Sequence, residues 1–150
     1  SGFVHADLPH LIFNMVTFYF FAFALERQIG AARFAVLYIL GLVVSDLGTY
    51  FKHRNDPQYA SLGASGAISA VLFAAIVYFP WMKLFIIPIP VPIPAPLFAV
   101  GYVAYTWYSA RQARGRINHD AHLGGALFGV LFVMLTDPAA FGQLLRWAGG

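Results

Sequence analysis

Two short motifs contain residue types that can carry out nucleophilic catalysis. In the first, Gly63-Ala64-Ser65-Gly66, a serine lies between glycines where a loop is expected to enter an apolar helix. Glycine allows a sharp turn and the close approach of another group. The start of a helix offers unpaired N–H groups and a positive dipole end, which stabilise an oxyanion. Alone the motif is weak, because Gly-x-Ser-Gly in such a helix is more often a packing motif.

The second motif contains His122 at the start of another apolar stretch. A stripe of small residues accompanies it at every fourth position, namely Ala121, Gly125 and Gly129. A matching stripe follows Ser65, namely Gly66, Ala70 and Ala74. Such stripes allow close helix packing in lipid. If they meet, Ser65 and His122 fall within hydrogen-bond reach, which is the nucleophile–base arrangement of serine hydrolysis. The alternative is a histidine that only caps a neighbouring carbonyl.

A third polar group lies early in the chain. His10 and Asn14 are spaced i, i+4 and so share one face of a helix. Both side chains can donate a hydrogen bond to a developing oxyanion. The alternative is a polar pair that joins two helices. His5 precedes the helix start near Asp7 and is interpreted as a residue that orders the loop.

Neither a metal site nor a full catalytic triad is favoured. The chain has five histidines, but it lacks a His-Glu-x-x-His motif, and zinc ligands usually occur in tighter pairs. We therefore predict no metal and no cofactor. Asp120 precedes His122 by two residues, so on a helix it points to roughly the opposite side. Asp46 would come from another helix and is a weaker candidate, which leaves a Ser65–His122 dyad as the simplest interpretation.

Composition indicates where these residues are placed. Of the 150 residues, 60% are hydrophobic and only 10% are charged, and the mean hydropathy is +0.71. A soluble domain of this length cannot bury so much apolar surface. The net charge of +3 comes from scattered basic residues, so nucleic acid is not an expected partner, and the chain has no cysteine. The plausible class is a polytopic membrane protein.

Uncharged windows predict about five transmembrane helices. The windows are Leu8–Leu25, Phe34–Phe51 (interrupted by Asp46), Pro57–Met82, Leu84–Ala110 and Ala121–Thr136. Loops are expected near Glu26–Arg33, Lys52–Ser61, Trp81–Pro94 and Arg111–Asn118. Proline at every second position from Pro88 to Pro96 removes donors and predicts an extended, polyproline-like stretch, so the fourth helix should run from about Pro94–Pro96 to Ala110. The tail, Pro138–Gly150, is expected to be an interfacial helix or disordered.

The order of the spans places the polar residues at one membrane face. His10, Ser65 and His122 each lie at the start of a span, and two crossings separate each from the next. They should therefore meet at one end of an all-α helix bundle. Lys83 would lie at the opposite face, which argues against a Ser–Lys pair.

Taken together, the motifs resemble those of the rhomboid family of intramembrane serine proteases. The resemblance runs through His5-x4-His10-x3-Asn14, Glu26-x3-Gly30-x3-Phe34, Gly63-x-Ser65-Gly66 and Ala121-His122-x2-Gly125-x3-Gly129. It implies a single rhomboid-like membrane domain over residues 1–150, with a core at about 3–137 and a tail at 138–150. The family's core usually has six spans and the resemblance begins at the second, so we expect a fragment that lacks the usual first span.

The resemblance also implies roles for individual residues. Ser65 would be the nucleophile and His122 the general base, while His10, Asn14 and the Ser65 amide would form the oxyanion hole. Structural support would come from His5, Gly63, Gly66, Gly125 and Gly129. Some members have an aromatic residue four positions after the serine that stacks on the histidine. This chain has Ser69 there, so the imidazole must be held in another way.

The function that this resemblance implies is cleavage of transmembrane segments of other membrane proteins. The expected location is a bacterial inner membrane, with the site toward the outer face. The main alternative is a non-catalytic rhomboid-like protein that binds transmembrane clients. A transporter component is less favoured, because transporter sites lie near the midplane rather than toward one face.

Overall fold

The structure is a computed structural model that describes residues 4–5, 7–56, 63–86, 89–112 and 118–150. Within these residues, the five predicted spans correspond to five helices: α1 (Leu8–Ile29), α2 (Ala31–His53), α3 (Ser65–Tyr78), α4 (Ala95–Gln112) and α5 (His119–Thr136). A short 3-10 turn, Pro138–Ala140, leads into α6 (Phe141–Gly149). The prediction of an all-α helix bundle is confirmed, apart from one small hairpin.

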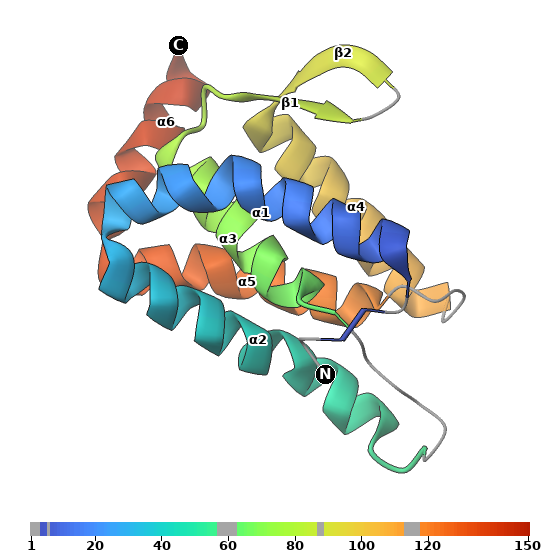
Figure 1. Ribbon diagram of the computed structural model, residues 1–150. Coiled ribbons are helices and arrows are strands. Elements are labelled where there is room, and N and C mark those ends of the chain that lie inside the picture. The colour runs from blue at the N-terminus through green and yellow to red at the C-terminus, as the bar shows by residue number, and fades with distance from the viewer. Residues whose placement is uncertain (1–3, 6, 57–62, 87–88, 113–117) are drawn as a thin grey trace.

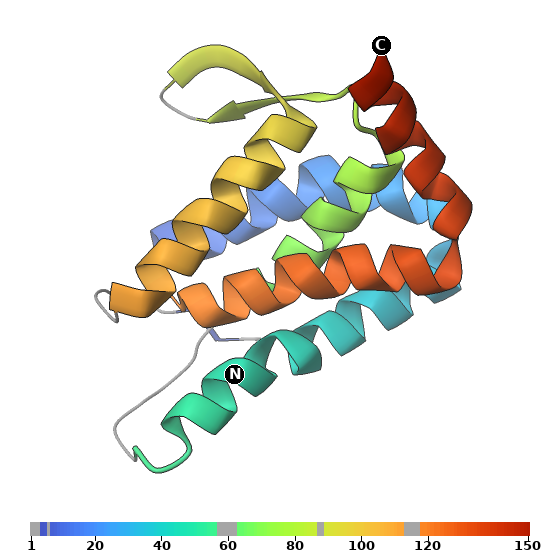
Figure 2. The ribbon, with the colours of Figure 1, turned by 180° about the vertical axis from the view of Figure 1, so that it is seen from behind.

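Helix α3 is the centre of the bundle. Figures 1 and 2 show it surrounded by the other helices. Every residue from Gly66 to Tyr78 is buried, although α3 has only 14 residues. At 1.5 Å per residue such a helix spans about 21 Å, less than the roughly 30 Å hydrocarbon core of a bilayer. Because neighbouring helices rather than lipid cover it, this short length is tolerated.

The outer helices carry the apolar surface that a bilayer would cover. In the described part of the chain, α1, α2 and α5 are long and apolar enough to cross a membrane. Large hydrophobic side chains on them remain exposed, among them Phe13, Phe20, Ile39, Val43 and Leu135. Soluble monomers rarely expose so much contiguous apolar surface. The bundle is therefore a polytopic membrane protein.

The loop expected over Glu26–Arg33 does not form. Helix α1 continues to Ile29 and α2 begins at Ala31, so Gly30 alone separates them. Its φ of +83° ends α1, and its N–H donates to the Glu26 carbonyl oxygen at 2.7 Å. Glutamate and arginine are good helix formers, so charge did not end the helix; a left-handed glycine did. The loops expected over Lys52–Ser61 and Arg111–Asn118 fall partly outside the described residues.

The proline-rich stretch is extended, as predicted, but it is paired rather than polyproline-like. Strands β1 (Lys83–Ile86) and β2 (Ile89–Pro94) form an antiparallel hairpin, in which Leu84 pairs with Ile93. Successive N–H groups of a strand point to opposite edges, so prolines at alternate positions leave one edge able to pair. Helix α4 follows directly at Ala95, close to its predicted start.

The tail is a helix rather than a disordered segment. Phe141 and Leu144 of α6 pack against the core, while Leu145 and Arg146 are exposed. Just before it, the Tyr78 hydroxyl donates to the Asp137 carboxylate at 3.1 Å. This bond joins the end of α3 to the residue that follows α5.

The starts of α1, α3 and α5 lie at the same end of the bundle, as the order of the spans predicted (Figures 1 and 2). The ends of α3 and α5 lie toward the opposite side, near α6. His10, Ser65 and His122 belong to the first turns of these three helices. The topology thus brings the polar residues of three distant segments to one end.

The contact between α3 and α5 generates a prediction about stability. A β-carbon at Gly129 would collide with the Ala70 carbonyl on α3. Gly129→Ala should therefore lower the free energy of unfolding by about 1–3 kcal/mol. Gly48→Ala is the matched control, because a β-carbon on that α2 glycine meets open space. The control should be neutral, or stabilising by up to about 1 kcal/mol, since alanine favours helix. Thermal unfolding in detergent measures both, and equal melting temperatures would contradict the close packing.

Candidate active site

Ser65 is the first residue of α3 and is half-buried. Gly63 precedes it with a φ of +100°, a conformation that favours glycine and that turns the chain into the helix. The first helical bond runs from the Ile68 N–H to the Ala64 carbonyl at 3.0 Å, and no side chain caps this end in the described structure. The N–H groups of the first turn around Ser65 are therefore left without a partner inside the helix.

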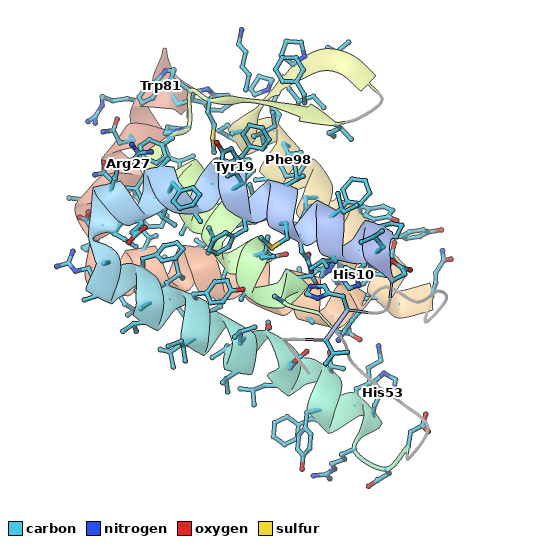
Figure 3. The ribbon with its side chains drawn as sticks, in the orientation of Figure 1. His10, Tyr19, Arg27, His53, Trp81 and Phe98 are labelled. Carbon is cyan, nitrogen blue, oxygen red and sulfur yellow. The ribbon has the colours of Figure 1, made fainter. Side chains whose placement is uncertain are left out.

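His10 and Asn14 lie directly against the glycine turn that leads to Ser65. A β-carbon at Gly63 would lie 2.6 Å from Cε1 and 2.8 Å from Nε2 of His10, and 3.6 Å from Nδ2 of Asn14. Figure 3 shows His10 at the end of α1 that carries the site. His10 and Asn14 therefore share one face of α1, as their i, i+4 spacing predicted, and this face meets the turn. A side chain at Gly63 would occupy the space of the His10 imidazole, so the turn needs glycine there.

Asn14 is unusual among the buried polar residues. Its side chain is only 7% exposed, and its Nδ2 has no hydrogen-bond partner among the residues that the structure describes. A buried amide without a partner costs free energy. Such a donor, placed beside the approach to Ser65, is suited to a group that arrives during a reaction.

His5 packs on His10. The two rings meet edge to face with centroids 5.3 Å apart. Asp7 caps α1, because its Oδ1 accepts from the His10 N–H at 2.8 Å. These two contacts hold the first turn of α1 and the imidazole of His10 in place.

The two small-residue stripes meet. A β-carbon at Gly125 would collide with the Gly66 carbonyl, and one at Gly66 would lie 3.3 Å from the Ala121 carbonyl oxygen. Gly66 directly follows Ser65, while Ala121 directly precedes His122. His122 is also one turn before Gly125, so it shares that face of α5. The α3 backbone just after Ser65 is therefore in contact with the α5 backbone just before His122. The sequence pattern predicted that Ser65 pairs with His122 if these two stripes meet.

Two aromatic neighbours of His122 were not predicted from the sequence. The ring of Tyr102 on α4 stacks on the imidazole with centroids 6.4 Å apart and planes 20° apart. His119 meets it edge to face at 6.2 Å, and Nδ1 of His119 is buried without a partner in the described structure. The i, i+3 spacing of His119 and His122 was a usable signal. No local pattern pointed to Tyr102, because its contact depends on how α4 docks.

The carboxylate of Asp120 is held by a residue other than His122. The Asp120 carboxylate forms an ion pair with Lys52 of α2 at 2.7 Å, so it points away from His122 as expected. Lys52 also donates to the Ala110 carbonyl at 3.3 Å, and the Thr49 hydroxyl donates to Asn118 at 2.9 Å. These bonds fasten the ends of α2 and α4 to the start of α5. Asp46 lies half-buried on α2.

A metal centre has no obvious place. Over the described ranges, no three histidine, aspartate or glutamate side chains are grouped so that they could hold a metal ion. The histidines near Ser65 are instead packed as rings against one another, in the pairs His5–His10 and His119–His122.

Comparisons with known proteins agree on one family. A family model described as Rhomboid domain matches residues 1–138. The presenilin-associated rhomboid-like protein A, mitochondrial, of Danio rerio is 34% identical over 98% of this chain, and its human counterpart is 33% identical over 98%. The putative rhomboid protease YdcA of Bacillus subtilis is 43% identical over 43% of this chain and 32% of its own length. No solved structure matches.

The chain spans less than half the length of these two mitochondrial relatives, namely 37% of the Danio rerio protein and 38% of the human one. Both are named as mitochondrial, so the expectation of a bacterial inner membrane is not supported, although a location in a membrane is. The family match, together with the meeting at one end of a membrane helix bundle of the three quoted motifs that contain His10, Ser65 and His122, shows that this chain belongs to the rhomboid family.

Proposed function

We propose that the protein is an intramembrane serine endopeptidase that cleaves transmembrane segments of other membrane proteins. The observation that carries this proposal is the convergence at one end of the bundle. The turn before Ser65 rests on His10 and Asn14, and the residue after Ser65 rests on the α5 backbone beside His122. The rhomboid family includes serine proteases of this kind, and the Bacillus subtilis relative is named as a putative one.

In the proposed reaction, His122 acts as the general base. It takes the proton of the Ser65 hydroxyl as the serine oxygen attacks the scissile carbonyl. The protonated imidazole then gives that proton to the leaving amine as the C–N bond breaks. Water hydrolyses the resulting ester by the same route, with His122 again accepting and returning the proton. The nucleophile comes from α3 and the general base from α5.

The oxyanion of the tetrahedral intermediate would be stabilised from two directions. One is the uncapped start of α3, whose N–H groups and dipole favour negative charge. The other is α1, where the unpartnered Nδ2 of Asn14 and the imidazole of His10 lie beside Gly63. Preorganised donors of this type are among the largest contributions to catalysis.

The position of the proposed site supports a transmembrane segment as the substrate. Its residues are in the first turns of membrane helices rather than in the middle of the bundle, so the scissile bond would be near one membrane face. A helical substrate hides its peptide carbonyls in internal hydrogen bonds. The cleaved segment must therefore unwind locally at this end, where water for the second step is available.

The dyad makes a direct prediction. Ser65→Ala and His122→Ala should each lower cleavage of a transmembrane reporter by about 10⁴-fold or more, because either loss removes the activated nucleophile. A fluorophosphonate should label the serine of the unaltered protein and should not label Ser65→Ala. Asp120→Asn is the control, since its carboxylate is paired with Lys52, and it should retain cleavage within about threefold.

Two results would decide against this dyad. Unchanged cleavage by Ser65→Ala would exclude Ser65 as the nucleophile. An unaltered protein that binds a transmembrane client, yet neither cleaves it nor reacts with the fluorophosphonate, would instead be a non-catalytic rhomboid-like binder.

The variant Asn14→Leu distinguishes a catalytic role of Asn14 from a structural one. Asn14→Leu replaces a buried, unpartnered amide with an apolar side chain of similar size, so the free energy of unfolding should stay the same or rise by about 1 kcal/mol. The value of kcat should fall about 100-fold, as for other lost oxyanion donors. Thr49→Val is the matched control. It removes a buried group that does have a partner, so stability should fall by about 1 kcal/mol while kcat is kept. A destabilised Asn14→Leu with normal kcat would make Asn14 a structural residue.

A further inference from the structure

We infer that Tyr102 of α4 is a positioning residue for His122, and that its hydrogen bond with Ser69 fixes it in place. This inference rests on the proposed function, since it concerns how the general base is held. It answers a question that the sequence left open, because this chain has Ser69 at the position where some members of the family have an aromatic residue that stacks on the histidine.

Tyr102 contacts both helices of the dyad at once. Its ring stacks on the imidazole of His122 on α5, with centroids 6.4 Å apart and planes 20° apart. Its hydroxyl lies 2.9 Å from the hydroxyl of Ser69 on α3. Ser69 is one helical turn after Ser65, so it shares a face of α3 with the nucleophile. One side chain therefore spans from the face that carries Ser65 to the ring of His122.

The surroundings of Tyr102 restrict its ring. Phe73 of α3 and Phe98 of α4 lie on it with centroids 5.4 Å and 5.7 Å away. Ser69 is only 5% exposed, so its hydroxyl has little water to bond with in place of Tyr102. A ring held at its sides by two aromatics and at its tip by a buried hydroxyl is a rigid surface for the imidazole to rest on. His119 closes another edge of that imidazole.

The arrangement has a mechanistic consequence. A general base must present its accepting nitrogen to the serine hydroxyl, and a ring that is free to turn does so for only part of the time. Stacking limits the rotation of His122 without taking up either of its ring nitrogens. Holding the base thus depends on a third helix, α4, which carries neither member of the dyad.

The main test compares two substitutions of Tyr102 in the whole protein reconstituted in liposomes. Tyr102→Leu removes the ring and should lower kcat by about tenfold, with KM kept within about twofold. Tyr102→Phe retains the ring but loses the hydrogen bond with Ser69, so it should lower kcat by only about threefold. The rate at which a fluorophosphonate labels Ser65 should fall in parallel with kcat, because that reaction also needs the base but no substrate binding.

Phe132→Leu is the matched control, because it removes a buried ring from the helix that carries His122, and the ring contact of Phe132 is with Phe128. It should lower the melting temperature about as much as Tyr102→Leu while leaving kcat within about twofold. A merely structural Tyr102 would behave like Phe132. Equal losses of kcat in the two variants, or an unchanged kcat in Tyr102→Leu, would overturn the inference.

A double-mutant cycle tests the part played by Ser69. Ser69→Ala and Tyr102→Phe each remove the same hydrogen bond, so the double variant should have the kcat of either single variant. Additive losses would show that Ser69 does not act through Tyr102.

The outcomes also separate this inference from the proposed function. If Ser65→Ala and His122→Ala abolish cleavage but Tyr102→Leu retains the full kcat, only the role of Tyr102 is wrong. If cleavage survives Ser65→Ala, the proposed dyad is wrong, and the role of Tyr102 falls with it.

Discussion

The close approach of the α3 and α5 backbones is the constraint on which the rest of the structure depends. At Gly125 and Gly129 there is no room for one additional methyl group between the two helices. In lipid, helices gain nothing from burying apolar surface against each other, so association relies on van der Waals packing between small residues. That packing places α3 at the centre of the bundle and keeps the starts of α3 and α5 side by side. The relative position of Ser65 and His122 is therefore set by contacts between two backbones and not by flexible side chains.

The remaining polar contacts divide into two kinds. Some fasten helix ends and have their hydrogen bonds made, as in Lys52–Asp120, Thr49–Asn118 and Tyr78–Asp137. Others lie at the site end of the bundle with buried nitrogens that have no partner in the described structure, as in Asn14 and His119. Buried unpaired groups cost stability, so a fold retains them where they are used. Two of the satisfied contacts, Lys52–Asp120 and Thr49–Asn118, also lie at the start of α5, so that end of the bundle does not lack hydrogen-bond partners in general.

Several elements were predictable because a single physical requirement set them. The apolar length needed to cross a bilayer fixed the approximate positions of five helices, and the alternate prolines required an extended segment before α4. The predictions failed where the structure depends on more than one local property of the sequence. Charged residues were taken to end α1, but Glu26 and Arg27 favour helix and only Gly30 interrupts it. The pairing of β1 with β2 was missed because strand pairing depends on a partner, which a local pattern does not reveal.

The sequence by itself determined that the protein belongs in a membrane, that a helix starts at Ser65, and that small residues line the faces of two helices. These properties follow from composition, glycine geometry and the helical repeat, all of which are local. Only the tertiary structure decided which glycines meet, that His10 and Asn14 rest on Gly63, and that Tyr102 stacks on His122 with its hydroxyl on Ser69. The rotation and docking of each helix are set by its packing against all of its neighbours, and that information is spread over the whole chain.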